Sequence, residues 1–255
     1  SFNIFNKRYT LSMPHKVHEE TAELKNTILY IDPAGGGLNA AETGYAFGGL
    51  LNSNIYAKAY GGVKGGYHKD QLLEMAKIAL KLRPASIVIE KNFGYGAYKE
   101  VFTPVLTAVY KEAGLTAPGI HDDMVSGQKE ARMIDTLEPV IGRGALVIHE
   151  DAILNEEAAL AKYDLKSRET YSLMHQLARV TREKGALIHD DRLDALSGLV
   201  KAFLPALAAD QDKAAQAIKD AEVKAFLANP MRHPTHTLVQ KPKSPGWYGN
   251  RVRRL

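Results

Sequence analysis

The chain has 255 residues, a formal net charge of +4 and no cysteine. Without cysteine it can form neither a disulfide framework nor a thiolate metal site, and no apolar run approaches the ~20 residues of a membrane-spanning helix. The positive charge gathers at the end of the chain, because Glu222 is the last acidic residue and seven basic residues follow it. This basic tail suits contact with phosphate or with an acidic protein, and it is equally typical of a solvated segment.

The first part of the chain predicts an antiparallel meander. Residues 1–26 are polar and have no clear period, so we interpret them as a linker or entry segment. Apolar and β-favouring residues then predict strands at 27–32, 42–51 and 55–60, whose short connections favour antiparallel pairing. The glycine-rich run at 61–66 is expected to be a flexible loop.

Helices and strands alternate from residue 70 to residue 161. The apolar spacing predicts four helices, at 70–82, 95–113 (kinked at Pro104), 128–141 and 151–161. Between them lie three short segments that we interpret as strands, at 86–90, 120–125 and 145–149. A strand as apolar as 86–90 is typical of the middle of an α/β sheet.

The last third of the chain is expected to be mainly helical. Residues 169–182 fit a helix, although 163–172 also fit a hairpin. A helix begins at the aspartates from residue 190 and runs to about Leu207, and an alanine-rich helix follows at 212–229. Residues 230–255 are expected to be poorly ordered. The whole order predicts an α/β fold, with three antiparallel strands and then parallel strands in one mixed sheet flanked by helices.

Carboxylates stand at three points where a predicted strand ends or a helix begins. Asp32 ends the first strand before three glycines, and Glu90 ends the strand at 86–90. Asp190, Asp191 and Asp194 open the helix that follows, where residues three and four apart share a face. A turn explains an isolated aspartate and a cap explains one or two acids in a first turn. Neither explains Asp194, or the cost of burying Glu90 without a partner.

Converging carboxylates repel one another and need a cation. Oxygen ligands of this kind favour Mg²⁺ or Mn²⁺ over zinc. Two such ions about 4 Å apart can activate a water molecule and stabilise the leaving oxygen when a phosphodiester is cleaved. The carboxylates therefore predict a site for one or two hard metal ions at the edge of the sheet.

Five local motifs, taken in order, resemble one protein family. They are residues 31–37 with Glu42-Thr43, residues 60–62 with Gly65-Gly66, residues 89–94, the run Gln128-Lys129-Glu130-x-Arg132, and residues 189–196. Together these motifs resemble the C-terminal nuclease domain of the terminase large subunit of tailed, podovirus-like bacteriophages, within the RNase H-like superfamily. The resemblance covers residues 27–205.

The resemblance implies a Mg²⁺- or Mn²⁺-dependent endonuclease that cleaves double-stranded DNA with two metal ions and cuts concatemeric viral genomes during packaging. Asp32, Glu90, Asp191 and Asp194 would be catalytic, and with Asp190 they would bind the metals. Among the three helix aspartates we expect Asp191 to be the principal ligand, then Asp194, then Asp190. The nuclease domain would span 27–208, followed by a helix at 209–229 and the basic tail.

The resemblance also implies partners that the chain does not contain. No Gly-x-x-x-x-Gly-Lys-Ser/Thr motif occurs in the sequence. We therefore interpret the chain as the nuclease part alone, which would act with a terminase ATPase domain, the terminase small subunit and the procapsid portal in the cytoplasm of the host cell.

Basic and amide side chains near the predicted site are candidates for contact with the DNA backbone, although a turn or an ordinary charged surface explains each of them as well. These candidates are Lys64, Lys91, Asn92, Lys129 and Arg132. Two other functions fit the same pattern. One is an RNase H-like junction resolvase or a nuclease for RNA–DNA hybrids, and the other is a non-catalytic module that docks on the portal or on DNA.

Overall fold

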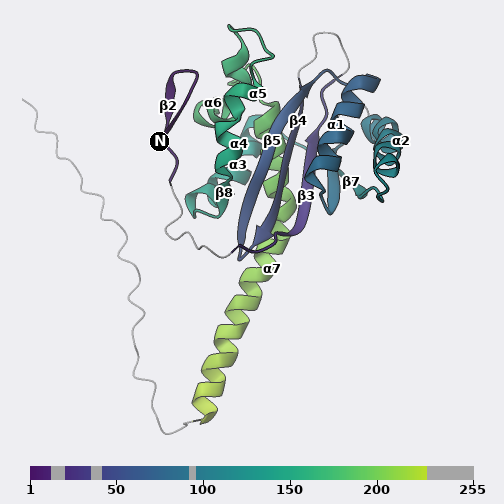
Figure 1. Cartoon of the computed structure of the whole chain (residues 1–255). Coiled ribbons are helices and arrows are strands. Elements are labelled where there is room, and N and C mark those ends of the chain that lie inside the picture. Colours follow the sequence, from purple (N-terminus) through teal and green to yellow (C-terminus); the bar gives the residue numbers. More distant parts are fainter. Residues whose placement is uncertain (13–20, 36–41, 92–95, 229–255) are drawn as a thin grey trace, which may run out of the picture. The chain divides into compact units, whose positions relative to one another are not determined.

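The structure is a computed structural model, and it describes residues 1–12, 21–35, 42–91 and 96–228 (Figure 1). The chain divides into two compact units, residues 1–210 and residues 211–255. All the strands and the candidate site lie in the first unit. Within the described ranges, no helix is long and apolar enough to cross a membrane.

The first unit is built on a six-stranded mixed sheet with the order β7-β6-β3-β4-β5-β8. Strands β3, β4 and β5 pair antiparallel, as the sequence predicts, whereas β6 runs parallel to β3, β7 parallel to β6 and β8 parallel to β5. The strands are β3 (Lys25–Asp32), β4 (Glu42–Leu51), β5 (Asn54–Lys64), β6 (Ser86–Glu90), β7 (Gly119–Asp123) and β8 (Leu146–Ile148). The predicted mixed α/β sheet is therefore confirmed.

Helices cover both faces of this sheet (Figure 1). Helices α1 (Lys69–Leu82) and α2 (Ala97–Glu112) cover one face. Helices α3 (Lys129–Gly142), α6 (Leu173–Arg179) and the first part of α7 (Asp191–Ala228) cover the other. Short elements join them, namely α4 (Glu150–Leu154), α5 (Glu156–Ala159) and the 3-10 helix η2 (Arg168–Tyr171).

Alternation along the central strands decides which face each side chain meets. In β3, Leu29 and Ile31 belong to the core beneath α1 and α2, whereas Tyr30 belongs to the core shared with α3 and α7. Because successive side chains of a strand point to opposite faces, Asp32 lies on the same face as Tyr30. In β6, Val88 packs against the α3 and α7 core, so Glu90 also lies on that face. Both carboxylates are thus directed toward α7.

The predicted flexible loop at 61–66 differs from the structure because glycine does not always signal a loop. Gly61 and Gly62 continue β5 and pair with Tyr45 and Gly44, so the run at 61–64 is strand and not flexible loop. A Cβ atom on Gly62 would lie 2.0 Å from the carboxyl carbon of Glu42. Glycine is needed here for close packing between strands.

The predicted entry segment at 1–26 contains a small hairpin of β1 (Phe2–Ile4) and β2 (Lys7–Tyr9). Phe5 and Asn6 both have positive φ values, 49° and 62°, as a two-residue turn between twisted strands requires. Sequence reading missed this hairpin because phenylalanine is an unusual residue for such a turn.

The end of the described chain also differs from the expectation of two helices. Helix α7 runs without interruption from Asp191 to Ala228. The segment between the two predicted helices holds alanine, aspartate and glutamine but no glycine or proline, so nothing ends the first helix there. The alternative hairpin at 163–172 is wrong, because η2 occupies 168–171. The basic tail at 230–255 lies outside the described residues.

A substitution at Gly44 tests how closely β4 must approach α7. A Cβ atom at Gly44 would lie 2.2 Å from the carbonyl oxygen of Asp191, so Gly44→Ala should force the start of α7 away from the sheet. We expect a loss of about 1–3 kcal/mol in the free energy of unfolding, measured by urea denaturation.

Gly142→Ala is the matched control for this change, because no atom lies within 4 Å of the added methyl group and the residue ends α3. That variant should keep or slightly raise the stability. Equal stabilities of the two variants would contradict the prediction.

Candidate active site

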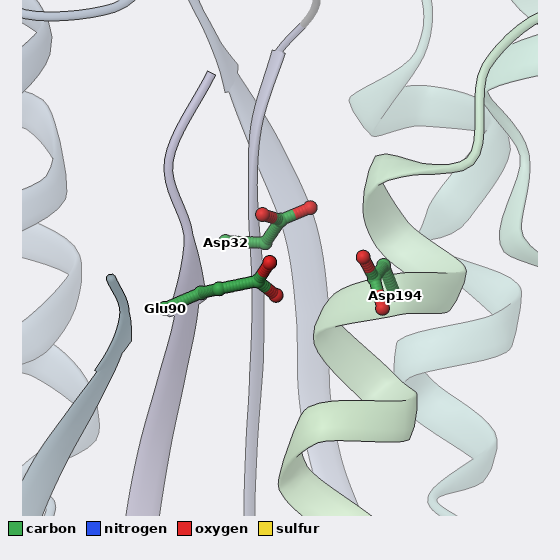
Figure 2. Close-up of side chains that lie close together, drawn as sticks. All are labelled: Asp32, Glu90 and Asp194. Atoms are coloured by element: carbon green, nitrogen blue, oxygen red, sulfur yellow. The ribbon is translucent and has the colours of Figure 1, made fainter. Parts of the chain in front are cut away.

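Three carboxylates from three separate elements meet on the α7 side of the sheet (Figure 2). Asp32 ends β3, Glu90 ends β6 and Asp194 lies near the start of α7. One oxygen of each lies within 4.8 Å of one oxygen of each of the others. The side chains of Asp32, Glu90 and Asp194 are only 12%, 11% and 3% exposed. This acidic triad is the candidate metal site.

Sheet pairing explains why Asp32 and Glu90 lie together. Ile31 of β3 pairs with Ile89 of the parallel strand β6, so the next residue of each strand lies at the same edge. Asp194 reaches this edge because α7 packs its first apolar turn, with Leu193 and Leu196, into the core against the sheet. The carboxylates that the sequence placed at strand ends and a helix start therefore converge through ordinary packing.

Two cations of α3 lie among these carboxylates. Lys129 Nζ lies 2.9 Å from Asp190 Oδ1, 3.2 Å from Asp194 Oδ2 and 3.6 Å from Asp32 Oδ2. Arg132 Nη2 donates to both oxygens of Asp194, each at 2.8 Å, and lies 3.8 Å from Glu90 Oε2. The structure thus places two residues predicted to contact DNA inside the acidic cluster.

The charges of the cluster are strongly coupled. Burial raises the pKa of Asp32, with the charges of Asp194 and Glu90 adding to the effect and Lys129 opposing it. Burial and the charge of Asp194 raise the pKa of Glu90 to about 7, against the opposing charge of Arg132. Burial alone would lower the pKa of Lys129, but the surrounding carboxylates raise it above its ordinary value. The ammonium group is therefore a fixed positive charge at the centre of the cluster.

Asp191 and Asp190 border the triad without belonging to it. Asp191 is buried, its Oδ2 has no hydrogen-bond partner among the described residues, and burial raises its pKa to about 7. Asp190 accepts the bond from Lys129. Sequence reasoning ranked Asp191 ahead of Asp194, whereas the geometry brings Asp194 to Asp32 and Glu90. The helix start alone does not reveal which of its faces meets the sheet edge.

Two other predicted DNA contacts, Lys91 and Lys64, lie outside the cluster. Lys91 follows β6 and lies 3.9 Å from Asp122, an exposed partner. Lys64 ends β5 and its Nζ lies 6.0 Å from the centre of the Tyr163 ring. Asn92 lies outside the described residues.

A buried ion pair that sequence reasoning did not single out as a pair holds the start of α7. Arg192 Nε donates to Glu42 Oε1 at 2.5 Å, and both residues are 1% exposed. Tyr163 donates its hydroxyl to the same carboxylate, and Arg192 Nη1 lies 3.9 Å from Glu156 Oε1. The sequence did offer one sign of this pair, because Arg192 stands beside the apolar residues Leu193 and Leu196 and is therefore expected to be buried and to need a partner. Its partners, 36 and 150 residues away, emerge only in the fold.

All candidate ligands in this cluster are carboxylate oxygens, and Asp191 adds a buried oxygen that lacks a partner within the described chain. A donor set of this kind fits a hard divalent cation such as Mg²⁺ or Mn²⁺. The mixed sheet and its acidic edge together define an RNase H-like domain.

Comparison with known proteins gives the family. Residues 31–146 match the family described as "Terminase Bacteriophage T7, Ribonuclease H-like domain". The terminase large subunit of Enterobacteria phage T3 is 38% identical over 224 residues, which cover 88% of this chain and 36% of that protein. Residues 31–146 therefore match a terminase RNase H-like domain, and the resemblance to phage terminase large subunits is confirmed. This chain spans about a third of the length of the T3 terminase large subunit.

Solved structures give weaker likenesses. A human cytomegalovirus terminase nuclease domain, soaked with Mn and inhibitor-bound, is 15% identical with a TM-score of 0.48, over 70% of this chain and 82% of that one. The nuclease domain of the large terminase subunit gp2 of bacterial virus Sf6 is 13% identical with a TM-score of 0.44, over 70% and 89%. Because these TM-scores are below 0.5, the family membership rests on the sequence matches.

Lys129 occupies the position where a divalent cation would be attracted. Lys129→Met keeps much of the side-chain volume but removes the charge, so it should strengthen binding of Mn²⁺ in the absence of DNA, by about ten-fold. Isothermal titration calorimetry on the metal-free protein measures this affinity.

Lys99→Met is the control, because Lys99 is also paired with an aspartate, Asp122 at 3.2 Å, away from the cluster. Its Mn²⁺ affinity should match that of the wild type. Weaker binding by Lys129→Met would contradict the prediction and would show that Lys129 helps to hold the carboxylates in place.

The raised pKa of Glu90 predicts a pH dependence of stability in EDTA. Its pKa rises from 4.5 to about 7 on folding, so the folded protein holds this proton more tightly than the unfolded chain. The stability from Glu90 is therefore complete below pH 4.5 and is lost as the pH rises toward 7.

Urea unfolding between pH 4.5 and pH 8 should show a smaller decline for Glu90→Gln than for the wild type. Glu112→Gln, an exposed change at the end of α2, should leave the wild-type decline unaltered. Parallel curves for Glu90→Gln and the wild type would count against a raised pKa.

Proposed function

We propose that this chain is a metal-dependent endonuclease that cleaves double-stranded DNA by two-metal phosphodiester hydrolysis. The observation that carries the proposal is the acidic triad, in which Asp32, Glu90 and Asp194 bring buried oxygens within 4.8 Å of one another. Three carboxylate oxygens this close together form a donor set that suits a hard divalent cation. The relation to the T3 terminase large subunit supports a role in cutting viral DNA.

In this proposal Asp32, Glu90 and Asp194 hold Mg²⁺ or Mn²⁺, with Asp191 and Asp190 as further ligands. The ions would supply an activated water and charge stabilisation for the leaving oxygen. Arg132 orients Asp194 through its two hydrogen bonds.

Backbone and hydroxyl contacts hold the turn after Asp32. The N–H of Ala34 donates to Thr43 Oγ1 at 3.1 Å, and this hydroxyl donates to the carbonyl of Gly65 at 3.2 Å. The segment that follows Asp32 is thereby fixed to β4 and to the residue directly after β5. These contacts pre-organise the carboxylate for its ligand, which lowers the cost of assembling the site.

The biological role that we propose is the cutting of concatemeric genomes during packaging. The chain would act with a terminase ATPase domain and small subunit at the procapsid portal, in the cytoplasm of the host cell. The relation to the T3 large subunit over 88% of this chain supports this setting.

Plasmid cleavage tests the proposal directly. Wild-type protein with Mg²⁺ or Mn²⁺ should cut supercoiled and linear plasmid, and EDTA should abolish the cut. Asp32→Asn, Glu90→Gln and Asp194→Asn should each reduce the rate by about 100-fold or more while DNA binding is retained, because each removes a ligand charge. Asp70→Asn, an exposed acid in the first turn of α1, is the control and should cut at the wild-type rate.

The choice of substrate separates the remaining functions. Preference for a four-way junction or an RNA–DNA hybrid over linear duplex would favour a resolvase or a hybrid nuclease. Binding of DNA without cleavage in any metal would favour a docking module. Full activity of Asp32→Asn would refute the two-metal site proposed here.

A further inference from the structure

The cations closest to the acidic triad are engaged by its carboxylates. Lys129 lies within 3.6 Å of three aspartates, and Arg132 holds both oxygens of Asp194. A DNA duplex carries a phosphate charge along its whole length, and most protein contacts to it are made with these phosphates. A duplex at this site therefore needs further cations beside the cluster.

A stack of three rings leads from the cluster to such cations. The His189 ring, directly before Asp190, stacks on Tyr171 with centroids 3.8 Å apart and an interplanar angle of 17°. Tyr171 in turn stacks on Tyr163, with centroids 4.3 Å apart at 29°. The stack thus ties Tyr163 to the start of α7, where the acidic site lies.

Two exposed lysines gather at the Tyr163 end of this stack. Lys162 Nζ lies 5.5 Å from the centre of the Tyr163 ring, and Lys64 Nζ lies 6.0 Å from it. The electron-rich face of an aromatic ring attracts cations at this range. Lys162 also donates to the carbonyl of Gly62 at 3.3 Å. We call Lys64, Lys162 and the Tyr163 ring the lysine ledge.

The charges around the ledge leave it positive. The carboxylate of Glu42 that accepts from the Tyr163 hydroxyl is already paired with Arg192 in the interior. The acid beside the lysines is Glu74, 3.9 Å from Lys162 and with 55% of its side chain exposed. An exposed pair at this distance contributes little. Among the residues that the structure describes, the two ammonium groups therefore face solvent with one weak acidic partner, Glu74.

We propose that the lysine ledge binds backbone phosphates of the duplex on the flank of the acidic site, one at each lysine, and so sets where the strand lies when it is cut. The inference rests on the proposed nuclease function. Contacts with phosphate fix register and orientation without reading sequence, so the ledge would hold DNA of any sequence. The ligand class is a nucleic-acid phosphodiester, and the occupant is double-stranded DNA.

The salt dependence of binding tests this proposal. Fluorescence anisotropy with a labelled blunt duplex in EDTA, at several KCl concentrations, gives the slope of log K against log salt. Each phosphate contact contributes about 0.9 to this slope. Lys64→Gln and Lys162→Gln should each lower its magnitude by about 0.9, and the double variant by about twice that. Lys64→Arg and Lys162→Arg keep the charge and should keep the slope.

Lys111→Gln is the control, because Lys111 is an exposed lysine in the last turn of α2, on the opposite face of the sheet from α7. Its slope should equal that of the wild type. Unchanged slopes for both ledge variants would overturn the ledge, and plasmid cleavage by the same variants in Mg²⁺ would show that the nuclease function stands without it. A wild type that neither binds nor cuts DNA would overturn both.

Discussion

Like charges packed at one edge of the sheet are the constraint on which this structure depends. Asp32, Glu90 and Asp194 are buried together, and burial raises the pKa of both Asp32 and Glu90. Helix α3 compensates these negative charges with Lys129 and Arg132, which lie at the start of the helix. The positive end of the helix dipole at this point adds to the same effect. The position of α3 on the sheet is therefore tied to electrostatics as well as to its buried apolar residues.

A second, separate set of charges holds the other side of the start of α7. Arg192 lies in the interior with Glu42 and Glu156, and breaking a buried pair of this kind is strongly destabilising. Gly44 allows β4, the strand that carries Glu42, to approach the backbone of Asp191 closely. The first turn of α7 is thus fixed by the triad cations on one side and by the Glu42–Arg192 pair on the other. Such support from a surrounding shell is what a metal site requires of its ligands.

Four cations around the start of α7 form two pairs with different contacts. Lys129 and Arg132 pair with carboxylates of the acidic cluster. The sequence alone could not show whether these two side chains contact carboxylates or DNA. Lys64 and Lys162 lie on the surface over an aromatic ring that is stacked back to the start of α7. In the proposed nuclease, the first group balances the carboxylates and the second group is available to the backbone of the substrate.

Local patterns in the sequence were enough to predict the mixed sheet, the antiparallel meander and the placing of Asp32 and Glu90 at strand ends. These follow from local periodicity, which reports the face of an element that is buried. Tertiary structure alone decided that Gly61 and Gly62 extend β5, that Asp194 and not Asp191 joins the triad, and that Lys129 points into it. Those outcomes depend on which elements pack together, and ion-pair partners such as Glu42 and Arg192, 150 residues apart, leave no periodic trace in the chain.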